Sequence, residues 1–212
     1  MVSQEVRRLI ETLPRLWQEI KWENTHKEAY WRLTVDGIPL LGNSHMRRAG
    51  AARCGCGVRP GHGASQDSPR RHHFWTCPVA QAVVGQVEPR LGETITRAHV
   101  WLVQAPGHTE QCVWDVIVLA AIAAMETGRR YMAASLRRGA DQGEPNLEAG
   151  VELAERGARR AVMDFWGRLH GFAQLGVPKR GWDSVGRYHP ILRVTETGLR
   201  CAGPSFDDEP PA

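Results

Sequence analysis

Two short runs of metal-ligand residues, Cys54-Gly55-Cys56-Gly57 and His72-His73-Phe74-Trp75-Thr76-Cys77, lie close together near the middle of this chain of 212 residues. Thiolate sulfur and imidazole nitrogen are ligands that zinc prefers, and a closed set of four such ligands stabilises structure instead of supplying chemistry. The segment between the two runs is polar and rich in turn-forming residues, so it cannot form a core by itself. The pattern therefore predicts one structural Zn²⁺ ion that holds this segment in place.

The spacing of the ligands leaves two points open. One residue separates Cys54 from Cys56, whereas structural zinc sites usually have about two to four between paired ligands. Both sulfurs can still reach one metal if Gly55 lets the backbone turn tightly. Spacing alone does not choose the fourth ligand among His72, His73 and His62.

Composition and charge limit the classes of protein to which this chain can belong. The formal net charge is +4, which favours anionic partners only weakly. An odd number of cysteines, five, argues against a complete disulfide framework, so we expect an intracellular protein, nuclear or cytoplasmic. The longest apolar run, residues 112–125, contains Asp115 and is shorter than the ~20 residues that cross a bilayer. We therefore expect a buried core helix here and no membrane partner.

Hydrophobic residues recur at helical spacing along most of the chain. This periodicity predicts a mainly α-helical fold organised around one structural zinc loop, with two long C-terminal helices and little or no β structure. Only residues 188–194 suggest an extended segment or a short hairpin. We expect three parts: a zinc-binding helical domain, a helical hairpin packed on it, and an irregular C-terminal segment with a disordered acidic tail. Their predicted bounds are residues 1–104, 105–177 and 178–212.

Four local signals predict where helices begin or bend. Thr25 followed by Glu28 is typical of a capping box, and Thr109 is placed to cap the long helix that follows it. Pro14 is expected to kink the first helix or to start a second one. Pro78 directly follows the last cysteine and is expected in the first turn of a helix.

These motifs occur in a recognisable order along the chain. The segments are Trp31-Arg32-Leu33, Ile38-Pro39, Cys54-Gly55-Cys56-Gly57 and His72-His73-Phe74-Trp75-Thr76-Cys77-Pro78-Val79-Ala80. Over about residues 14–90 this order resembles the zinc-binding domain at the C-terminal end of reverse transcriptases from non-LTR retrotransposons. That family has His-x4-Cys-Pro-x-Ala before a hydrophobic helix, and usually has two residues between its first two cysteines, where this chain has one.

The resemblance implies both the ligands and a function. By the family pattern the metal ligands are Cys54, Cys56, His72 and Cys77. The resemblance further implies a non-catalytic module that binds RNA or DNA, derived from a retrotransposon reverse transcriptase. Arginine suits phosphate contacts, and the arginines expected to bind nucleic acid flank the cluster: Arg47, Arg48, Arg53, Arg70 and Arg71. Trp75, between two ligands, either stacks on a base or packs in the core.

Two other classes of function are compatible with parts of the sequence. In a helical scaffold that binds a protein partner through its long helices, zinc would be only structural. For an enzyme, we find no polymerase aspartate pair, no nuclease pattern and no Ser/His/Asp set in the sequence. Asp115 and Glu126 would lie on one side of one helix but roughly 16 Å apart, too far to share one metal ion. We therefore expect no enzymatic activity.

Overall fold

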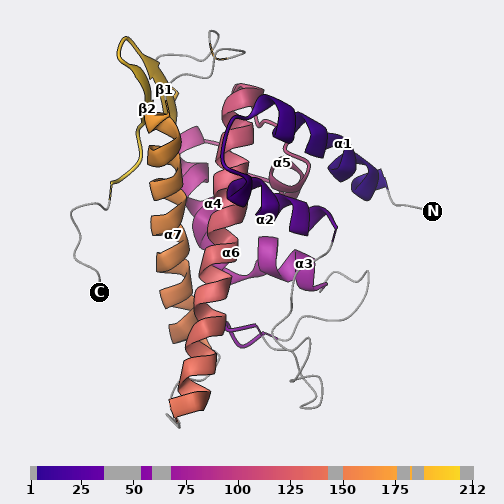
Figure 1. Ribbon diagram of the computed structural model, residues 1–212, viewed down its shortest axis with the longest axis vertical. Coiled ribbons are helices and arrows are strands. Elements are labelled where there is room, and N and C mark those ends of the chain that lie inside the picture. The colour runs from indigo at the N-terminus through magenta and orange to yellow at the C-terminus, as the bar shows by residue number, and fades with distance from the viewer. Residues whose placement is uncertain are drawn as a thin grey trace.

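The computed structural model describes residues 4–35, 54–58, 68–142, 150–175, 182 and 189–205, and these form a mainly α-helical protein (Figure 1). The predicted fold class is confirmed. The elements, in chain order, are α1 (Gln4–Glu19), α2 (Asn24–Thr34), α3 (Pro69–Arg71), the π-helical segment η2 (His72–Thr76), α4 (Pro78–Leu91), α5 (Arg97–Trp101), α6 (Gln111–Gln142), α7 (Val151–Gln174), β1 (Leu192–Thr195) and β2 (Gly198–Cys201).

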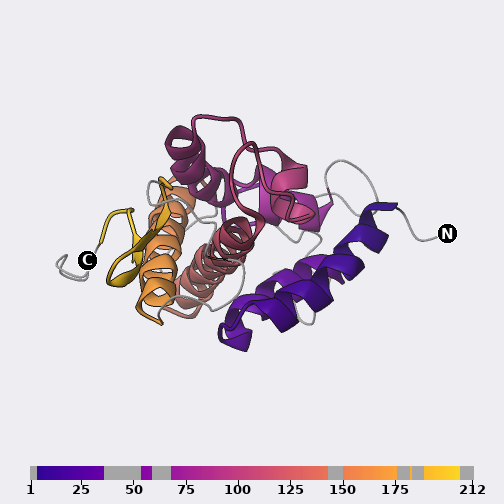
Figure 2. The same cartoon turned by 90° about the horizontal axis from the view of Figure 1, so that it is seen from above.

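Helix α6 lies at the centre of the fold. Nearly every residue from 113 to 126 is buried, because other elements surround this helix. Seen from above, α7 lies on one side of α6, α1 and α2 lie on another, and α4 and α5 cover a third (Figure 2). One hydrophobic core runs through all of these helices, from Leu16 in α1 to Leu199 in the C-terminal hairpin. The predicted boundaries at residues 104 and 177 remain predictions.

One described helix, Gln111–Arg138 within α6, is long and apolar enough to cross a bilayer, judged by length and composition alone. Its most apolar stretch has a mean hydropathy of 1.4, and 83 % of that stretch is buried inside the protein. Packing within the fold therefore accounts for the apolar character of this helix, as expected for a core helix.

Helices α6 and α7 cross at two glycines. A Cβ atom added to Gly128 would lie 2.6 Å from the carbonyl oxygen of Gly157, and one added to Gly157 would lie 2.7 Å from the Cγ atom of Met132. Only glycine fits such a close approach of two backbones. The sequence pattern of hydrophobic residues did not indicate this contact.

The C-terminal strands form an antiparallel hairpin in the register Leu192↔Cys201 to Thr195↔Gly198. This confirms the hairpin alternative for part of residues 188–194. Gly198, in the tight turn, has φ +123°, which favours glycine. The hairpin packs against the C-terminal half of α7, as Figure 1 shows at the top of the molecule.

Several predicted helix ends differ from the observed ones. Helix α2 begins at Asn24 after Glu23, without a side-chain cap, so Thr25 lies inside the helix and forms no capping box. Helix α6 begins at Gln111, two residues after Thr109. Helix α1 continues through Pro14, so Pro14 does not start a second helix; Ile10, whose carbonyl loses its usual helical partner, is an exposed residue. The prediction for Pro78 is confirmed, since it is the first residue of α4.

Two buried carboxylates in α6 are paired with arginines. Asp115 is 1 % exposed and pairs with Arg15 of α1. Glu126 is 5 % exposed and accepts two hydrogen bonds from Arg129, at 2.6 and 2.7 Å. Arg32 of α2 also reaches Glu126, at 3.3 Å. Because a buried charge is tolerated only when paired, these contacts help to orient α1 and α2 against α6.

We expect replacement by alanine to have opposite effects on stability at a glycine in the helix crossing and at a glycine with open space around it. Gly128→Ala should destabilise the protein by about 1–3 kcal/mol, because its Cβ would meet backbone of α7 that cannot move aside. Gly85→Ala, in α4, should stabilise it by about 0.5–1 kcal/mol, because nothing lies within 4 Å and alanine loses less entropy in a helix. Urea unfolding of both variants measures the difference. Equal effects of the two substitutions would contradict the close crossing.

The stabilisation by Glu126 should depend on pH. Burial raises the pKa of Glu126, but hydrogen bonds from Arg129 and Arg130 outweigh burial and leave this pKa below its ordinary value of 4.5. A carboxyl with a lowered folded-state pKa stabilises the fold above its unfolded-state pKa, and this stabilisation is lost as the pH falls through the folded-state value.

Glu126→Gln should therefore destabilise the protein at pH 7 by roughly 3–5 kcal/mol, because buried guanidinium groups lose their anion. The difference from the parent protein should shrink as the pH is lowered from about 5 to about 3, measured by urea unfolding at each pH. The exposed Glu155→Gln on α7 is the matched control and should change little. A penalty for Glu126→Gln that stays constant over this range would contradict the assignment.

Candidate metal centre

The first two cysteines are held in a tight turn. The backbone N–H of Cys54 donates to the carbonyl of Val58 at 2.8 Å, and the N–H of Gly57 donates to the carbonyl of Cys54 at 2.9 Å. Gly57 has φ +90°, a conformation that side chains disfavour. The turn brings the side chains of Cys54 and Cys56 to the same side despite their unusually short spacing.

The structure assigns a different role to Gly55 than the sequence suggested. The positive φ angle falls at Gly57, whereas Gly55 is required for packing: a Cβ atom there would lie 2.6 Å from the Cβ atom of Met132. The carbonyl of Gly55 also accepts a hydrogen bond of 3.0 Å from the N–H of Gly150, which precedes α7. The metal-binding turn is thus attached directly to the α6–α7 hairpin.

The second pair of ligands is separated by one π-helical turn. Ser68 caps the short helix α3 through a hydrogen bond of 3.2 Å from the N–H of Arg71. In η2 the N–H of Cys77 then donates to the carbonyl of His72 at 2.7 Å, a bond that spans five positions. This wide turn places the His72 ring and the Cys77 sulfur side by side before Pro78 starts α4. Short π-helical turns are frequent at functional sites.

The structure brings Cys54, Cys56, His72 and Cys77 together into one cluster. Their four ligand atoms all lie within 4.8 Å of one another. The Sγ atoms of Cys54 and Cys77 are 3.9 Å apart, and the Sγ atom of Cys56 is 3.3 Å from Nε2 of His72. Tetrahedral coordination with metal–sulfur bonds of about 2.3 Å and metal–nitrogen bonds of about 2.0 Å requires separations of about 3.8 and 3.5 Å. These two separations are close to the tetrahedral values, so the four residues could hold one metal ion.

The cluster is closed and largely buried. Cys54 and Cys77 are each 2 % exposed and His72 is 4 % exposed, while Cys56 is half-buried. The other ring nitrogen of His72, Nδ1, lies 3.4 Å from the hydroxyl of Thr76, a contact that orients the ring. With four protein ligands, a metal ion here would have no open position for a substrate, which is typical of a structural site.

The electrostatics of the cluster favour a cation. Hydrogen bonds with Cys54 and Cys77 lower the pKa of the Cys56 thiol, whereas hydrogen bonds with Cys54 and Cys56 raise the pKa of Cys77. Burial lowers the pKa of His72, but hydrogen bonds to the sulfurs of Cys54 and Cys56 outweigh it and raise this pKa to about 9. Without a cation, three thiolates cannot coexist at this distance, and a bound metal would remove that repulsion.

Among the histidines that spacing left open, His72 is the one that joins the sulfurs. His73 is also buried, at 6 % exposed, but both of its ring nitrogens lack a hydrogen-bond partner within the described chain. Burial lowers the pKa of His73 to about 3, helped by the nearby charge of Arg129, so this ring is neutral at pH 7. The third candidate, His62, lies outside the described residues.

The arginines expected to bind nucleic acid are only partly described. Arg70 and Arg71 belong to α3, directly before the ligand His72, and both are half-buried. The guanidinium carbon of Arg70 lies 5.2 Å from the centroid of the Trp101 ring. Arg47, Arg48 and Arg53 lie outside the described residues.

Sequence reasoning did not predict the supporting roles of Gly57, Thr76 and Met132 around the ligands. A glycine after a cysteine pair is a signal for a tight turn and could have identified Gly57. Met132 contacts the metal-binding turn from α6, and no local pattern indicates such a distant contact.

Comparisons with protein-family models, curated proteins and solved structures find no match to this chain. The resemblance to the zinc-binding domain of reverse transcriptases therefore rests on the sequence motif alone.

We expect Cys77→Ser to release the metal and to unfold the segment around it. Loss of one buried thiolate opens the site, so bound metal should fall below about half an equivalent per chain, measured by elemental analysis of purified protein. Cys201→Ser, in β2 and outside the cluster, should keep the parent metal content.

The adjacent histidines provide a second matched pair. His72→Phe should lose the metal, whereas His73→Phe should keep it, because the His73 ring makes no hydrogen bond within the described chain that phenylalanine would remove. Full metal content in Cys77→Ser and His72→Phe would refute the ligand set.

Proposed function

We propose that the cluster binds a structural Zn²⁺ ion and that the metal-supported segment is a non-catalytic nucleic-acid-binding module, as the resemblance to retrotransposon reverse transcriptases implies. Three cysteines and one histidine with their ligand atoms within 4.8 Å of one another suit zinc, which takes four sulfur and imidazole ligands in its structural sites. The reduced cysteines that this site needs agree with an intracellular location.

The nucleic-acid proposal is supported mainly by two arginines that have no acidic partner among the described residues. Within the described chain, the guanidinium groups of Arg70 and Arg71 donate no hydrogen bond to a protein atom, and the Nε atom of each is buried. Several arginines of the core helices, in contrast, are paired with carboxylates, as Arg15 and Arg129 are. Unpaired guanidinium groups held beside a rigid metal site are well suited to contact phosphates.

The burial of two tryptophans near the metal cluster indicates that they pack in the core and do not stack on bases. Trp75 is half-buried and packs against the hydrophobic core. Trp101 is 1 % exposed, and its indole ring has Arg70 nearby as well as Arg97, at 4.8 Å. We therefore propose contacts to the nucleic-acid backbone, without recognition of base sequence by stacked aromatic rings.

The two buried carboxylates of α6 are not placed to take part in catalysis. Asp115 pairs with Arg15, and Glu126 pairs with Arg129, so neither is available to the other or to the metal cluster. We propose that the protein has no catalytic activity of its own.

A helical scaffold that binds a protein partner is the second candidate, and exposed apolar residues favour it. On α1, Ile10 is 54 % exposed and Trp17 is 39 % exposed, and on α2 Trp31 is 47 % exposed. Large apolar side chains exposed on adjacent helices are typical of surfaces that bind another protein. A stable homodimer that does not bind RNA would favour this function.

Titration with a single-stranded RNA oligonucleotide at two salt concentrations tests the nucleic-acid proposal. The parent protein should bind in a salt-dependent manner. Replacement of Arg70 and Arg71 by glutamine should weaken binding and reduce the slope of log K against log salt by about 1.4, as expected when two phosphate contacts are lost. Metal content, measured on the same sample, should not change.

Arg193 and Arg200, an exposed cross-strand pair in the hairpin at the other end of α7, provide the matched control (Figure 1). Their replacement by glutamine removes the same charge and should leave the salt slope unchanged. Absence of binding at micromolar protein, or an equal effect of the two double substitutions, would overturn the proposal.

A further inference from the structure

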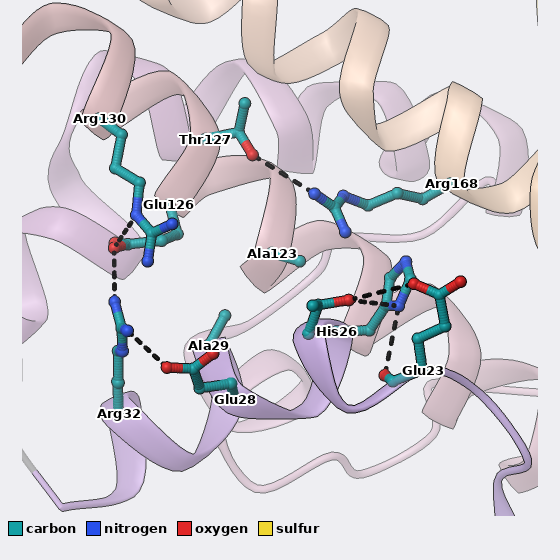
Figure 3. Close-up of a pocket in the computed structure, with 11 residues that line it drawn as sticks. Glu23, His26, Glu28, Ala29, Arg32, Ala123, Glu126, Thr127, Arg130 and Arg168 are labelled. Carbon is teal, nitrogen blue, oxygen red and sulfur yellow. Dashed lines mark hydrogen bonds and ion pairs between the residues drawn. The ribbon is translucent and has the colours of Figure 1, made fainter. Parts of the chain in front are cut away.

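A polar pocket of about 470 Å³ lies between α2, α6 and α7, built by residues other than the metal ligands (Figure 3). Its volume lies in the range of small-molecule sites. Three arginines line it, one from each helix: Arg32, Arg130 and Arg168. Ala123 contributes a small side chain to the wall and leaves space between the charged groups.

At one end of the pocket, guanidinium groups gather around Glu126. Glu126 binds Arg129 in a two-pronged ion pair and also accepts hydrogen bonds from Arg130, at 2.9 Å, and Arg32, at 3.3 Å. The only other carboxylate at this end in the described chain is Glu28, which pairs with Arg32 at 2.5 Å. The guanidinium groups of Arg32 and Arg130 therefore meet at Glu126 and form the arginine side of the pocket.

Arg130 has the geometry to hold that anion. Its Nε atom is fixed by Glu126, while its terminal Nη atoms donate to no protein atom within the described chain. The side chain is 58 % exposed, so a dissolved molecule can reach it. The two Nη groups of a fixed guanidinium form a planar fork that matches a phosphate or carboxylate.

The opposite side of the pocket offers hydrogen-bond acceptors. Burial lowers the pKa of His26, and the charge of Arg168 lowers it further, so the ring is neutral at pH 7. Nδ1 of His26 donates to the carbonyl of Glu23 at 3.3 Å, which leaves Nε2 as an acceptor. The carboxylate of Glu23 lies 3.5 Å from the hydroxyl of Thr25, and both residues line the pocket.

Arg168 is positioned between these two sides. Its Nε atom pairs with Asp164 at 2.6 Å, and one Nη atom reaches the hydroxyl of Thr127 at 3.4 Å. Figure 3 shows its guanidinium group pointing into the space between Thr127 and His26. The pocket therefore presents donors at its arginine side and acceptors at its Glu23 side.

We propose that this pocket binds a small molecule with an oxyanion, a phosphate ester or a carboxylate, at Arg130 and an amino or hydroxyl group at the Glu23 side. The proposal goes beyond the nucleic-acid function and does not depend on the metal, because α2, α6 and α7 build the pocket without any of the four ligands. Either a phosphate or a carboxylate can supply the oxyanion that binds Arg130, and calorimetry with matched probes can distinguish the two.

Isothermal titration calorimetry of the full chain at low salt tests the site, with phosphoethanolamine, inorganic phosphate and β-alanine as probes. We expect saturable binding of one probe molecule per chain. Tighter binding of phosphoethanolamine than of inorganic phosphate would support the amino-group contact at Glu23. Preference for phosphoethanolamine over β-alanine, which carries a carboxylate on the same aminoethyl group, identifies a phosphate site, and the reverse order identifies a carboxylate site.

Arg130→Gln should weaken binding about tenfold or more, since a charge-assisted hydrogen bond contributes that much to affinity. Arg138→Gln, exposed two turns further along α6 and absent from the pocket lining, removes the same charge and should change the affinity less than about twofold. Ala123→Leu fills the pocket without changing any charge and should weaken binding like Arg130→Gln. No saturable binding of any probe, equal losses in Arg130→Gln and Arg138→Gln, or full affinity in Ala123→Leu would overturn the proposal.

Discussion

Helix α6 is buried on every side over most of residues 113–126, so the rest of the protein has to enclose it. Helices α7, α2 and α4 each cover part of its circumference, and their arrangement follows from that need. Hydrophobic burial alone would allow α1 and α2 to pack against α6 in several orientations. The two carboxylates within this stretch restrict those orientations. Asp115 requires the arginine of α1, and Glu126 also pairs with the arginine of α2, so the N-terminal helices have few alternative positions.

The metal centre is attached to this helical core at its edge. Gly55 contacts Met132 of α6 and accepts a hydrogen bond from the residue that directly precedes α7. On the other side of the cluster, Cys77 directly precedes α4. A metal ion would therefore connect α4 to the far end of the α6–α7 hairpin, across a part of the chain whose own residues are too polar to pack together.

The sequence was informative where a pattern is local. Helical periodicity predicted the core helix, the long C-terminal helix and the start of α4 at Pro78, and ligand chemistry predicted four residues that the structure brings into one cluster. It was wrong at Thr25 and Thr109, because a cap depends on backbone angles that the side chain alone does not set. The Arg–Glu network around the pocket could not be predicted, since its members come from α2, α6 and α7 and meet only in the folded protein.

The π-helical turn of η2 constrains chain length more than composition. A bond from residue 77 to residue 72 spans one residue more than an α-helical turn does. Removal of any single residue between the histidine and the cysteine would restore an ordinary turn and rotate the sulfur by about 100° away from its partners. The number of residues between the histidine and the cysteine is thus fixed by the turn, and an insertion or deletion here marks a homologue that has lost the site.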